Sequence, residues 1–498
     1  MATVTVNGQP LPAAPGTLLS QVLRNRQGFE MPCAGHGRCG KCRVTASGAL
    51  SPLSTEELAH LTREEIARGV RLACCTHVAG DCSVTLSDSV HSRICLSGVM
   101  GSITLRPRFT AYGAAVDIGT TTLAASLYGA DGTLLAQASR ANPQAAWGAD
   151  VISRIEAALR GEGAALAACV RSAIDGLLRK MAEQSQIALD AIDALVITGN
   201  TAMLHFLTET SPEPLSHAPF EAKRLFGEAL PTSALGLTAG PNAGVYLPRC
   251  MSAFVGADIT TALLASSICQ GSETRMLVDI GTNGEMALWH QGQLFCCSTA
   301  AGPAFEGAGI SMGMHGQDGA VDHVTLEDGT LRPHVIGEVP PVGICGSGVI
   351  DALACLLETE ALDETGLLET APAPIAPPVV LTQQDVRMVQ LAKSAVSAGL
   401  RTLLRTQGLT CPEVAELAVA GGFGSYLDVA NAGRIGLIPE ELVPRVRVLG
   451  NAALSGAAML LLDRELIQPC EELARSARTL VLSANPVFTE YYTEGMFF

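Results

Sequence analysis

Five cysteines near the N-terminus have a spacing that could bind an inorganic cluster. Cys33, Cys39 and Cys42 lie within ten residues of one another, and Cys74 and Cys75 follow after a gap of 31 residues. A plant-type [2Fe–2S] site takes three thiolates from one loop and a fourth from a distant segment. The sequence therefore predicts a [2Fe–2S] cluster with the first three cysteines as ligands and with Cys74 or Cys75 as the fourth.

The loop between the first three cysteines is rich in glycine. Gly35, Gly37 and Gly40 allow the backbone to approach the inorganic sulfides and to offer N–H groups to them. A zinc site is the alternative, because two residues separate Cys39 from Cys42. Zinc ligands usually come as two matched pairs, which the adjacent cysteines 74 and 75 do not supply. We therefore favour the iron–sulfur cluster.

Two apolar segments further along the chain end in the same four residues, Asp-Ile-Gly-Thr, at 117–120 and 279–282. Each is expected to be a strand that delivers a carboxylate, Asp117 or Asp279, able to hold Mg²⁺ through water. The glycine that follows lets backbone amides approach phosphate oxygens closely. Two such hairpins facing each other across a cleft would clamp a triphosphate from both sides. The predicted nucleotide-binding residues of the hairpins are Gly119, Thr120, Thr121, Thr122, Gly281, Thr282 and Asn283.

These hairpins belong to a longer internal repeat. Residues 114–139 align with 276–299, residues 194–207 with 416–429, and residues 256–266 with 450–460. Three matches in one order indicate that the body of the chain is two copies of one α/β unit. The chain has no GxxxxGK[ST] motif, so a P-loop enzyme is not expected.

The duplicated pattern resembles the acetate kinase/sugar kinase/Hsp70/actin superfamily of ATPases over about residues 113–480. The resemblance implies an adenosine-binding motif in "VAGGFGSYL" (419–427), with Gly421, Gly422 and Gly424 against the purine. It also makes Asp150, in the segment after the first hairpin, a candidate for positioning the attacking water. Asp117, Asp150 and Asp279 are thus the predicted catalytic residues.

The elements around the cysteines also follow a known pattern. Strands are expected at 2–8, 41–48 and 82–88, and a short amphipathic helix at 16–28. This order resembles a β-grasp ferredoxin. Within that resemblance the context "RLAC" implies Cys74 as the fourth ligand. The predicted fold class is therefore α/β multidomain, an N-terminal α+β ferredoxin followed by a duplicated actin/Hsp70-like ATPase.

Several other stretches allow more than one interpretation. The glycine-rich runs 300–316 and 343–353 could be cleft loops or merely turns and helix starts. His205, His315 and His323 lack metal-ligand spacing and are expected to be structural. The proline-rich stretch 367–385 is predicted to be a surface loop before a helix at 386–404.

Composition limits the classes of function. The net charge of −16 argues against a nucleic-acid partner. No apolar run reaches the roughly 18 residues that a membrane helix needs, and the N-terminus does not resemble a signal peptide, so a cytoplasmic location is expected. We predict a ferredoxin-like domain at 1–86, a linker at 87–112, and ATPase subdomains at 113–270 and 271–498.

The combination of a ferredoxin head with an ATPase body suggests driven electron transfer. Plant-type clusters sit near about −400 mV, and each further 59 mV or so uphill costs tenfold in a one-electron equilibrium. The whole arrangement resembles the reductive activators of corrinoid proteins. The cysteine motif carries the resemblance together with the stretches "VDIGTNGEM", "AAGPAFEGAGI", "GICGSG" and "AGGFG".

The family resemblance implies ATP-dependent reduction of Co(II) to Co(I) in the corrinoid protein of a methyltransferase system. It also implies a homodimer and an electron donor that the sequence does not identify. Longer family members carry an extra domain where this chain has only the predicted linker. The alternatives are an ATP-driven activator of another low-potential enzyme, a small-molecule kinase with a redox-sensing head, and a nucleotide-gated redox-sensing binding module.

Overall fold

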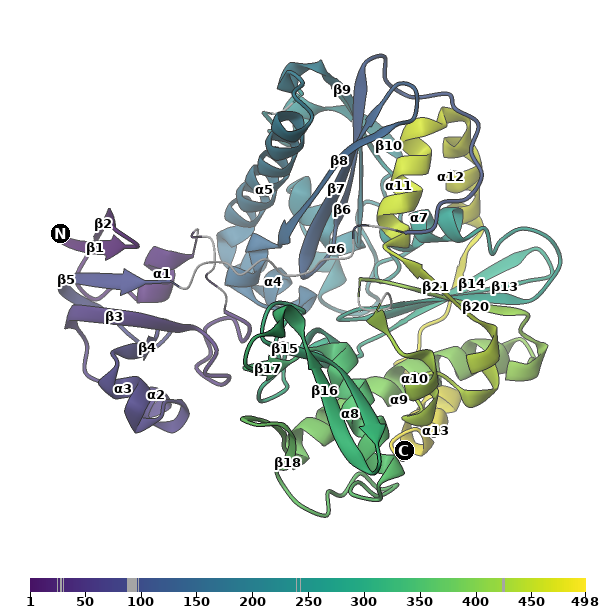
Figure 1. The fold of residues 1–498 in the computed structure, drawn as a ribbon. Coiled ribbons are helices and arrows are strands. Elements are labelled where there is room, and N and C mark those ends of the chain that lie inside the picture. Colours follow the sequence, from purple (N-terminus) through teal and green to yellow (C-terminus); the bar gives the residue numbers. More distant parts are fainter. Residues whose placement is uncertain are drawn as a thin grey trace. The chain divides into compact units, whose positions relative to one another are not determined.

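We describe residues 1–24, 26, 29, 31–86, 96, 98–238, 240–241, 243–422 and 426–498 of a computed structural model (Figure 1). The chain forms two compact units. The first contains Met1–His91 and Asn142–Val170, and the second contains Ser92–Ala141 and Arg171–Phe498. Among the described residues, no helix has both the length and the apolar character required to cross a membrane.

The first unit is built on a five-stranded sheet with the order β2-β1-β5-β3-β4. β1 pairs with β5 in parallel and with β2 in antiparallel register, which agrees with the predicted β-grasp arrangement. The strands are β1 (Ala2–Val6), β2 (Gln9–Ala13), β3 (Arg43–Leu50), β4 (Val70–Leu72) and β5 (Val78–Thr85), and the helices are α1 (Leu19–Leu23), α2 (Thr55–His60) and α3 (Arg63–Ala67). The predicted helix at 16–28 is thus shorter than expected.

The same unit includes the segment that follows the first Asp-Ile-Gly-Thr hairpin. This segment forms a short 3-10 turn and α4 (Val151–Ala157), and then leads into α5 (Gly163–Gln184). Glu162 accepts a hydrogen bond from Trp147 Nε1 at 2.7 Å and pairs with Arg24, whose guanidinium lies 5.5 Å from the Trp147 ring centroid. Ala149 N also donates to Pro32 O at 3.2 Å, directly before the first cysteine.

The second unit contains two six-stranded sheets with matching pairing patterns, which confirms the predicted duplication. Their orders are β10-β11-β9-β6-β7-β8 and β21-β20-β12-β13-β14-β22. The first sheet comprises β6 (Tyr112–Ile118), β7 (Thr122–Gly129), β8 (Leu134–Ala141), β9 (Ile192–Gly199), β10 (Glu228–Pro231) and β11 (Gly244–Leu247). The second comprises β12 (Arg275–Ile280), β13 (Gly284–His290), β14 (Gln293–Thr299), β20 (Glu416–Ala420), β21 (Val446–Gly450) and β22 (Arg478–Thr479).

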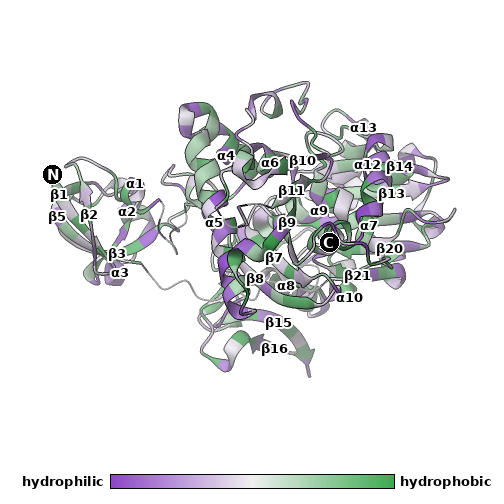
Figure 2. Ribbon diagram, turned by 90° about the horizontal axis from the view of Figure 1, so that it is seen from above, coloured by the Kyte–Doolittle hydropathy of each residue, from purple (hydrophilic) through white to green (hydrophobic). Residues whose placement is uncertain are grey.

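In both sheets the first strand of the repeat pairs antiparallel with the next strand of the hairpin and parallel with a later strand. β6 does so with β7 and β9, and β12 does so with β13 and β20. Most residues of β7 and β9 are apolar and buried (Figure 2). The residues at the ends of these strands are therefore positioned by a buried apolar core.

Two helices related by the repeat, α7 (Ala257–Ser266) and α11 (Ala452–Leu462), pack against each other between the sheets. A Cβ atom placed on Gly456 would lie 1.9 Å from Thr261 O, so the close crossing requires glycine there. The remaining helices of this unit are α6 (Thr201–Leu207), α8 (Gly346–Glu358), α9 (Gln383–Thr406), α10 (Val429–Arg434), α12 (Ile467–Ser476) and α13 (Pro486–Glu494). α9 confirms the helix predicted at 386–404.

The prediction of a surface loop for the proline-rich stretch needs correction. The proline-rich stretch contains an antiparallel pair, β18 (Ala373–Ala376) and β19 (Val379–Leu381), whose apolar residues are largely buried in the core. Residues 87–95 and 97 of the predicted linker lie outside the described residues. The rest of that linker packs on the body, where Arg106 Nε donates to Asp463 Oδ1 at 3.0 Å.

A small sheet with the order β16-β15-β17 completes the second unit. Its strands are β15 (Ala320–Glu327), β16 (Thr330–Val335) and β17 (Gly343–Ile344). β17 leads directly into α8 through Cys345, which is the N-cap residue of that helix. The glycine-rich run 343–353 therefore forms a strand and a helix start.

Candidate nucleotide and cluster sites

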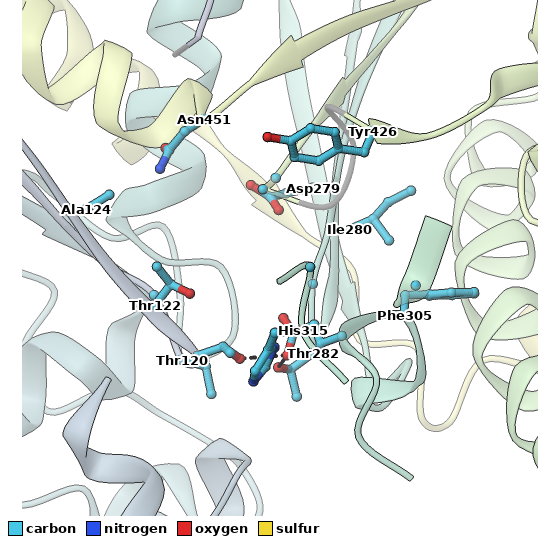
Figure 3. Close-up of a pocket in the computed structure, with 18 of the residues that line it drawn as sticks. Thr120, Thr122, Ala124, Asp279, Ile280, Thr282, Phe305, His315, Tyr426 and Asn451 are labelled. Atoms are coloured by element: carbon cyan, nitrogen blue, oxygen red, sulfur yellow. Dashed lines mark hydrogen bonds between the residues drawn. The ribbon is translucent and has the colours of Figure 1, made fainter. Parts of the chain in front are cut away.

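A cavity of about 280 Å³ opens within the second unit, and both Asp-Ile-Gly-Thr hairpins line it (Figure 3). Of the residues predicted from the sequence, those that line this cavity are Asp117, Gly119, Thr120, Thr121, Thr122, Asp279, Gly281, Thr282, Asn283, Gly421 and Gly422. Gly424 lies outside the described residues. The structure thus brings two predicted phosphate hairpins and the predicted adenosine motif to one site.

The turn of the first hairpin (117–122) requires glycine. Gly119 N donates to Thr122 O at 2.9 Å, and a Cβ atom on Gly119 would lie 2.7 Å from that same oxygen. Asn200, the N-cap residue of α6, donates through Nδ2 to Thr120 Oγ1 at 3.1 Å. The hairpin is therefore held in a fixed shape, with its hydroxyls toward the cavity.

The second hairpin (279–284) repeats this arrangement and packs against the predicted adenosine motif. Gly281 N donates to Asn283 O at 3.0 Å. Gly421 has a φ of 99°, and a Cβ atom there would lie 2.7 Å from Asp279 Oδ1. Glycine is thus required at this position, both by its backbone conformation and by the close approach of the carboxylate.

Three aspartates at the floor of the cavity influence one another. Burial raises the pKa of Asp117, Asp258 and Asp279 to about 7 each. A neighbouring charge raises each of these pKa values further. Asp279 acts in this way on Asp117, Asp117 on Asp258, and Asp258 on Asp279. Burial also raises the pKa of Glu285, which lies in the same cavity. In the part of the chain that the structure describes, no three His, Cys, Asp or Glu side chains are arranged to hold a metal ion directly.

Two polar residues of this site were missed by the sequence interpretation although they lie in its aligned repeats. Asp258 is in the first turn of α7, and Asn451 is the N-cap residue of α11. Asn451 Nδ2 donates to Asp117 Oδ2 at 3.2 Å. The alignment of 256–266 with 450–460 places the two helix starts in register, with Asp258 one position after the equivalent of Asn451, so the repeat pointed to these helix starts as parts of the site.

A third missed residue is Glu306. Its Oε2 atom accepts hydrogen bonds from Thr121 Oγ1 at 2.6 Å and from Thr282 Oγ1 at 2.8 Å. It therefore connects the two hairpins directly. Glu306 belongs to the glycine-rich run 300–316, for which the sequence left two interpretations open.

Both glycine-rich runs contribute residues to this cavity, 300–316 through a loop and 343–353 through the strand and helix start described above. The cavity-lining residues that they contribute are Phe305, Glu306, Met314, His315, Gly316, Cys345, Gly346 and Ser347. His315, expected to be structural, therefore lies at the site. His205 is fully buried and bonds Thr201 O, and His323 pairs with Asp351, which agrees with structural roles for both.

Asp150 has a local structural partner. It is the N-cap residue of α4, and its carboxylate accepts hydrogen bonds from Ser153 N at 2.9 Å and Ser153 Oγ at 2.8 Å. Asp150 belongs to the first compact unit. Its role toward the attacking water remains a prediction from the resemblance.

In the first unit the cysteines form two pairs. Cys33 and Cys39 are hydrogen-bonded to each other, and the Sγ atoms of Cys42 and Cys74 lie 3.2 Å apart. The hydrogen bond between Cys33 and Cys39 lowers the pKa of Cys33 to about 4, and the one between Cys42 and Cys74 lowers the pKa of Cys42. These four thiols are the predicted cluster ligands, and the structure places them in two contacting pairs.

The turn that carries Cys74 is held by a buried ion pair. Glu57 Oε1 accepts hydrogen bonds from Arg71 Nε at 2.7 Å, from Leu72 N at 3.0 Å and from Thr76 Oγ1 at 3.0 Å. Glu57 is fully buried, so these bonds fix the backbone on both sides of the turn. Cys75 Sγ lies 3.5 Å from Cys74 Sγ.

Comparisons with known proteins agree with both sites. A model described as the 2Fe-2S iron-sulfur cluster binding domain matches residues 4–79, one described as the RACo middle region matches 112–270, and one described as the C-terminal domain of RACo, the ASKHA domain, matches 273–498. The corrinoid activation enzyme RamQ of Eubacterium limosum is 35% identical over 426 residues, which cover 78% of this chain and 70% of that protein. The chain belongs to the family of reductive activators of corrinoid proteins.

Other members of the family extend the match. The [Co(II) methylated amine-specific corrinoid protein] reductase of Methanosarcina barkeri is 27% identical over 359 residues, or 64% of this chain and 66% of that protein. A solved structure titled reductive activator for corrinoid, iron-sulfur protein is 27% identical and has a TM-score of 0.71, covering all of this chain and 98% of the other. The family match at 112–270 contains the first hairpin and Asp258, and the match at 273–498 contains the second hairpin and Glu306.

Proposed function

We propose that this protein uses ATP to drive the one-electron reduction of the cobalt in a corrinoid protein from Co(II) to Co(I). The observation that carries the proposal is the union, in one chain of this family, of a paired-cysteine loop and a duplicated ATPase cleft. The corrinoid protein is the substrate, and Co(I) is the form to which a methyl group can be added in a methyltransferase system.

The charges of the cleft favour Mg²⁺ as the companion of ATP. The acidic residues that line the cavity are Asp117, Asp258, Asp279, Glu285, Glu306 and Asp322. Among the described cavity-lining residues there is no Lys or Arg. A free triphosphate would be repelled by this surface, whereas Mg²⁺ bound by aspartates 117 and 279 through water would neutralise both the carboxylates and the phosphates.

The cysteine pairs support the assignment of cluster ligands. We assign Cys33 and Cys39 to one iron and Cys42 and Cys74 to the other, because each pair is already in contact. A Cβ atom on Gly40 would lie 2.9 Å from the His60 side chain, so this part of the loop is closely packed. When bound, a [2Fe–2S] cluster supplies a one-electron carrier of low potential.

Coupling between the two sites has a covalent route. β8 of the first hairpin ends at Ala141, and the next residues, from Asn142 on, belong to the compact unit that contains the cysteines. In that unit, Ala145 O accepts a hydrogen bond at 3.2 Å from the backbone nitrogen of Met31, which lies two residues before Cys33. A conformational change in the hairpin on ATP binding would therefore displace the segment that contacts the cysteine loop. A nucleotide-dependent change of this kind is the minimum that an allosteric coupling requires.

Replacement of Asp279 by Ala tests the proposal. We expect Asp279→Ala to abolish ATP-dependent formation of the Co(I) absorption band, because a carboxylate that holds Mg²⁺ is lost. The [2Fe–2S] spectrum should be unchanged, since the cysteines belong to another unit. Asp190→Ala, which removes an exposed aspartate, is the matched control and should retain full activity. Reduction that survives in Asp279→Ala would refute the role assigned to the second hairpin.

A further inference from the structure

Glu306 connects the two predicted phosphate hairpins. Thr121 comes from the first hairpin and Thr282 from the second, and both hydroxyls donate to the same carboxylate oxygen. The other oxygen of Glu306, Oε1, is 3.6 Å from the position that a Cβ atom would take on Gly281. The carboxylate thus lies beside the backbone of the second hairpin while it bridges to the first.

This arrangement excludes simultaneous binding of a phosphate by the same hydroxyls. A threonine hydroxyl has a single proton to donate. While Thr121 and Thr282 donate to Glu306, neither can donate to a phosphate oxygen. A phosphate group at this position would also be repelled by the carboxylate, because two negative charges would share one partly buried site. Either the phosphate or Glu306 can occupy the space between the hairpins.

The turn that carries Glu306 lies between two glycines, one in an open and one in a closely packed position. Glu306 ends a short 3-10 turn (Pro303–Glu306) that is flanked by Gly302 and Gly307, with φ angles of 79° and 78°. A Cβ atom on Gly302 would meet nothing within 4 Å, so this end of the turn is open. Gly307 is closely packed against Met314, whose backbone nitrogen would lie 2.6 Å from such an atom.

Beyond Gly307 the chain forms a compact loop that is attached to a long helix. Gly313 N donates to Ile310 O at 3.1 Å within the loop. Ser311 donates to Asp385 Oδ1 through its backbone nitrogen at 2.7 Å and through its hydroxyl at 3.0 Å. Asp385 lies in the first turn of α9, the longest helix of the second unit. Movement of Glu306 would therefore be passed on to the start of α9.

We propose that Glu306 is the residue by which the protein distinguishes ATP from ADP. In the nucleotide-free and ADP-bound protein its carboxylate bridges the two hairpins, and in the ATP-bound protein the terminal phosphate takes over both threonine hydroxyls and displaces it. The proposal rests on the proposed function, because it requires that ATP binds in this cleft. Glu306 acts as a positioning residue that reports the terminal phosphate to the loop 307–314.

Equilibrium binding of Mg²⁺ with ADP, and with an ATP analogue whose terminal bridge cannot be hydrolysed, tests the proposal. We expect Glu306→Ala to increase the affinity for the ATP analogue about tenfold, the scale of one hydrogen bond to a charged group. The affinity for ADP should change less than about threefold by the same reasoning. Glu306→Gln keeps the shape but not the charge and should give an intermediate increase. The exposed Glu327→Gln is the matched control and should change neither affinity.

Hydrogen–deuterium exchange supplies a second readout on the whole chain. In the wild-type protein, exchange in residues 300–316 should be faster with the ATP analogue than with ADP, and in Glu306→Ala it should be the same with both. Equal shifts of the two affinities in Glu306→Ala would overturn the proposal. So would an unchanged affinity for the ATP analogue with loss of hydrolysis, which would make Glu306 a proton acceptor. A wild-type protein that binds neither nucleotide would instead overturn the proposed function.

Discussion

Three aspartates of the cleft lie close enough for their charges to raise one another's pKa. Asp117 and Asp279 come from the two hairpins, and Asp258 comes from the start of α7 between them. Asn451 is the neutral partner of Asp117 in the site. These three carboxylates repel one another when they are ionised, and we propose that Mg²⁺ bound together with ATP relieves this repulsion.

A pH dependence follows from the raised pKa values. Since the pKa of Asp117, Asp258 and Asp279 is about 7 in the folded protein and near 4 in the unfolded chain, the folded state binds more protons between these values. Their contribution to stability is therefore fully present below about pH 4 and is lost as the pH rises towards 7. We expect the free energy of unfolding of the metal-free protein to fall over this range by up to about 1.4 kcal/mol per pH unit for each proton.

Urea unfolding in EDTA at several pH values between 5 and 7.5 measures this slope. The variant Asp279→Asn should have a shallower slope than the wild-type protein, because one titrating group is absent. Addition of Mg²⁺ and ATP should reverse the trend, since metal binding requires deprotonated carboxylates. Identical slopes for the wild-type protein and the variant would contradict the assignment.

The two adjacent cysteines allow a sharp comparison. Cys74 Sγ lies 3.2 Å from Cys42 Sγ, whereas Cys75 contacts Cys74. We expect Cys75→Ser to retain two irons per chain and an unchanged visible spectrum. Cys74→Ser should lose most of the iron or show a shifted spectrum, because oxygen replaces a thiolate ligand. Iron content and the visible spectrum of the two purified variants decide the matter, and the reverse result would exchange the two assignments.

At this scale the sequence could predict residues that lie in motifs but not those brought in by tertiary packing. Asp117 and Asp279 lie at the ends of apolar strands, shortly before a glycine. The sequence pattern was therefore sufficient to predict that they lie at the site. Glu306 carries no such signature, because its role depends on hydroxyls that are 185 and 24 residues away in the chain. Asp258 was readable only through the internal repeat.

At the scale of elements the duplication determines where the cleft forms. Each repeat contributes a hairpin and a helix, and the two helices α7 and α11 meet at the centre. The hydrophobic alternation and the repeated segments were sufficient to predict the hairpins and α9. The β18–β19 pair was not predictable in this way, because proline-rich sequence is typical of loops and the pair is stabilised by burial against the core.

The crossing of α7 and α11 gives a stability prediction with a control inside the same unit. A Cβ atom on Gly456 would lie 1.9 Å from Thr261 O, whereas one on Gly176 in α5 would meet only Arg140 Nη1 at 3.8 Å. We expect Gly456→Ala to lower the free energy of unfolding by about 1–3 kcal/mol through overpacking. Gly176→Ala should be neutral or should raise it by about 0.5–1 kcal/mol, because alanine favours helices. Chemical denaturation of both variants measures the two free energies of unfolding. Equal changes in the two variants would show that α7 and α11 can move apart at their crossing without loss of stability.

At the scale of the whole molecule, the chain joins a low-potential electron carrier to an ATPase, and its two compact units do not follow simple sequence order. The segment Asn142–Val170 belongs with Met1–His91, although it is inserted between two parts of the second unit. The sequence predicted a ferredoxin-like domain followed by an ATPase. It could not show that residues 142–170 belong with the N-terminal unit, because this depends on contacts between distant segments, such as the hydrogen bond from Ala149 N to Pro32 O. The insertion gives the ATPase a continuous chain connection into the unit that carries the cysteines.

The central claim is that ATP makes possible an electron transfer that the cluster alone cannot complete. The most direct measurement is anaerobic, with the purified protein, a chemical reductant and a Co(II) corrinoid protein, followed by absorption spectroscopy with and without Mg²⁺ and ATP. We predict that the Co(I) band accumulates over many turnovers only when ATP is present. Complete formation of Co(I) at the same rate without nucleotide would contradict the account.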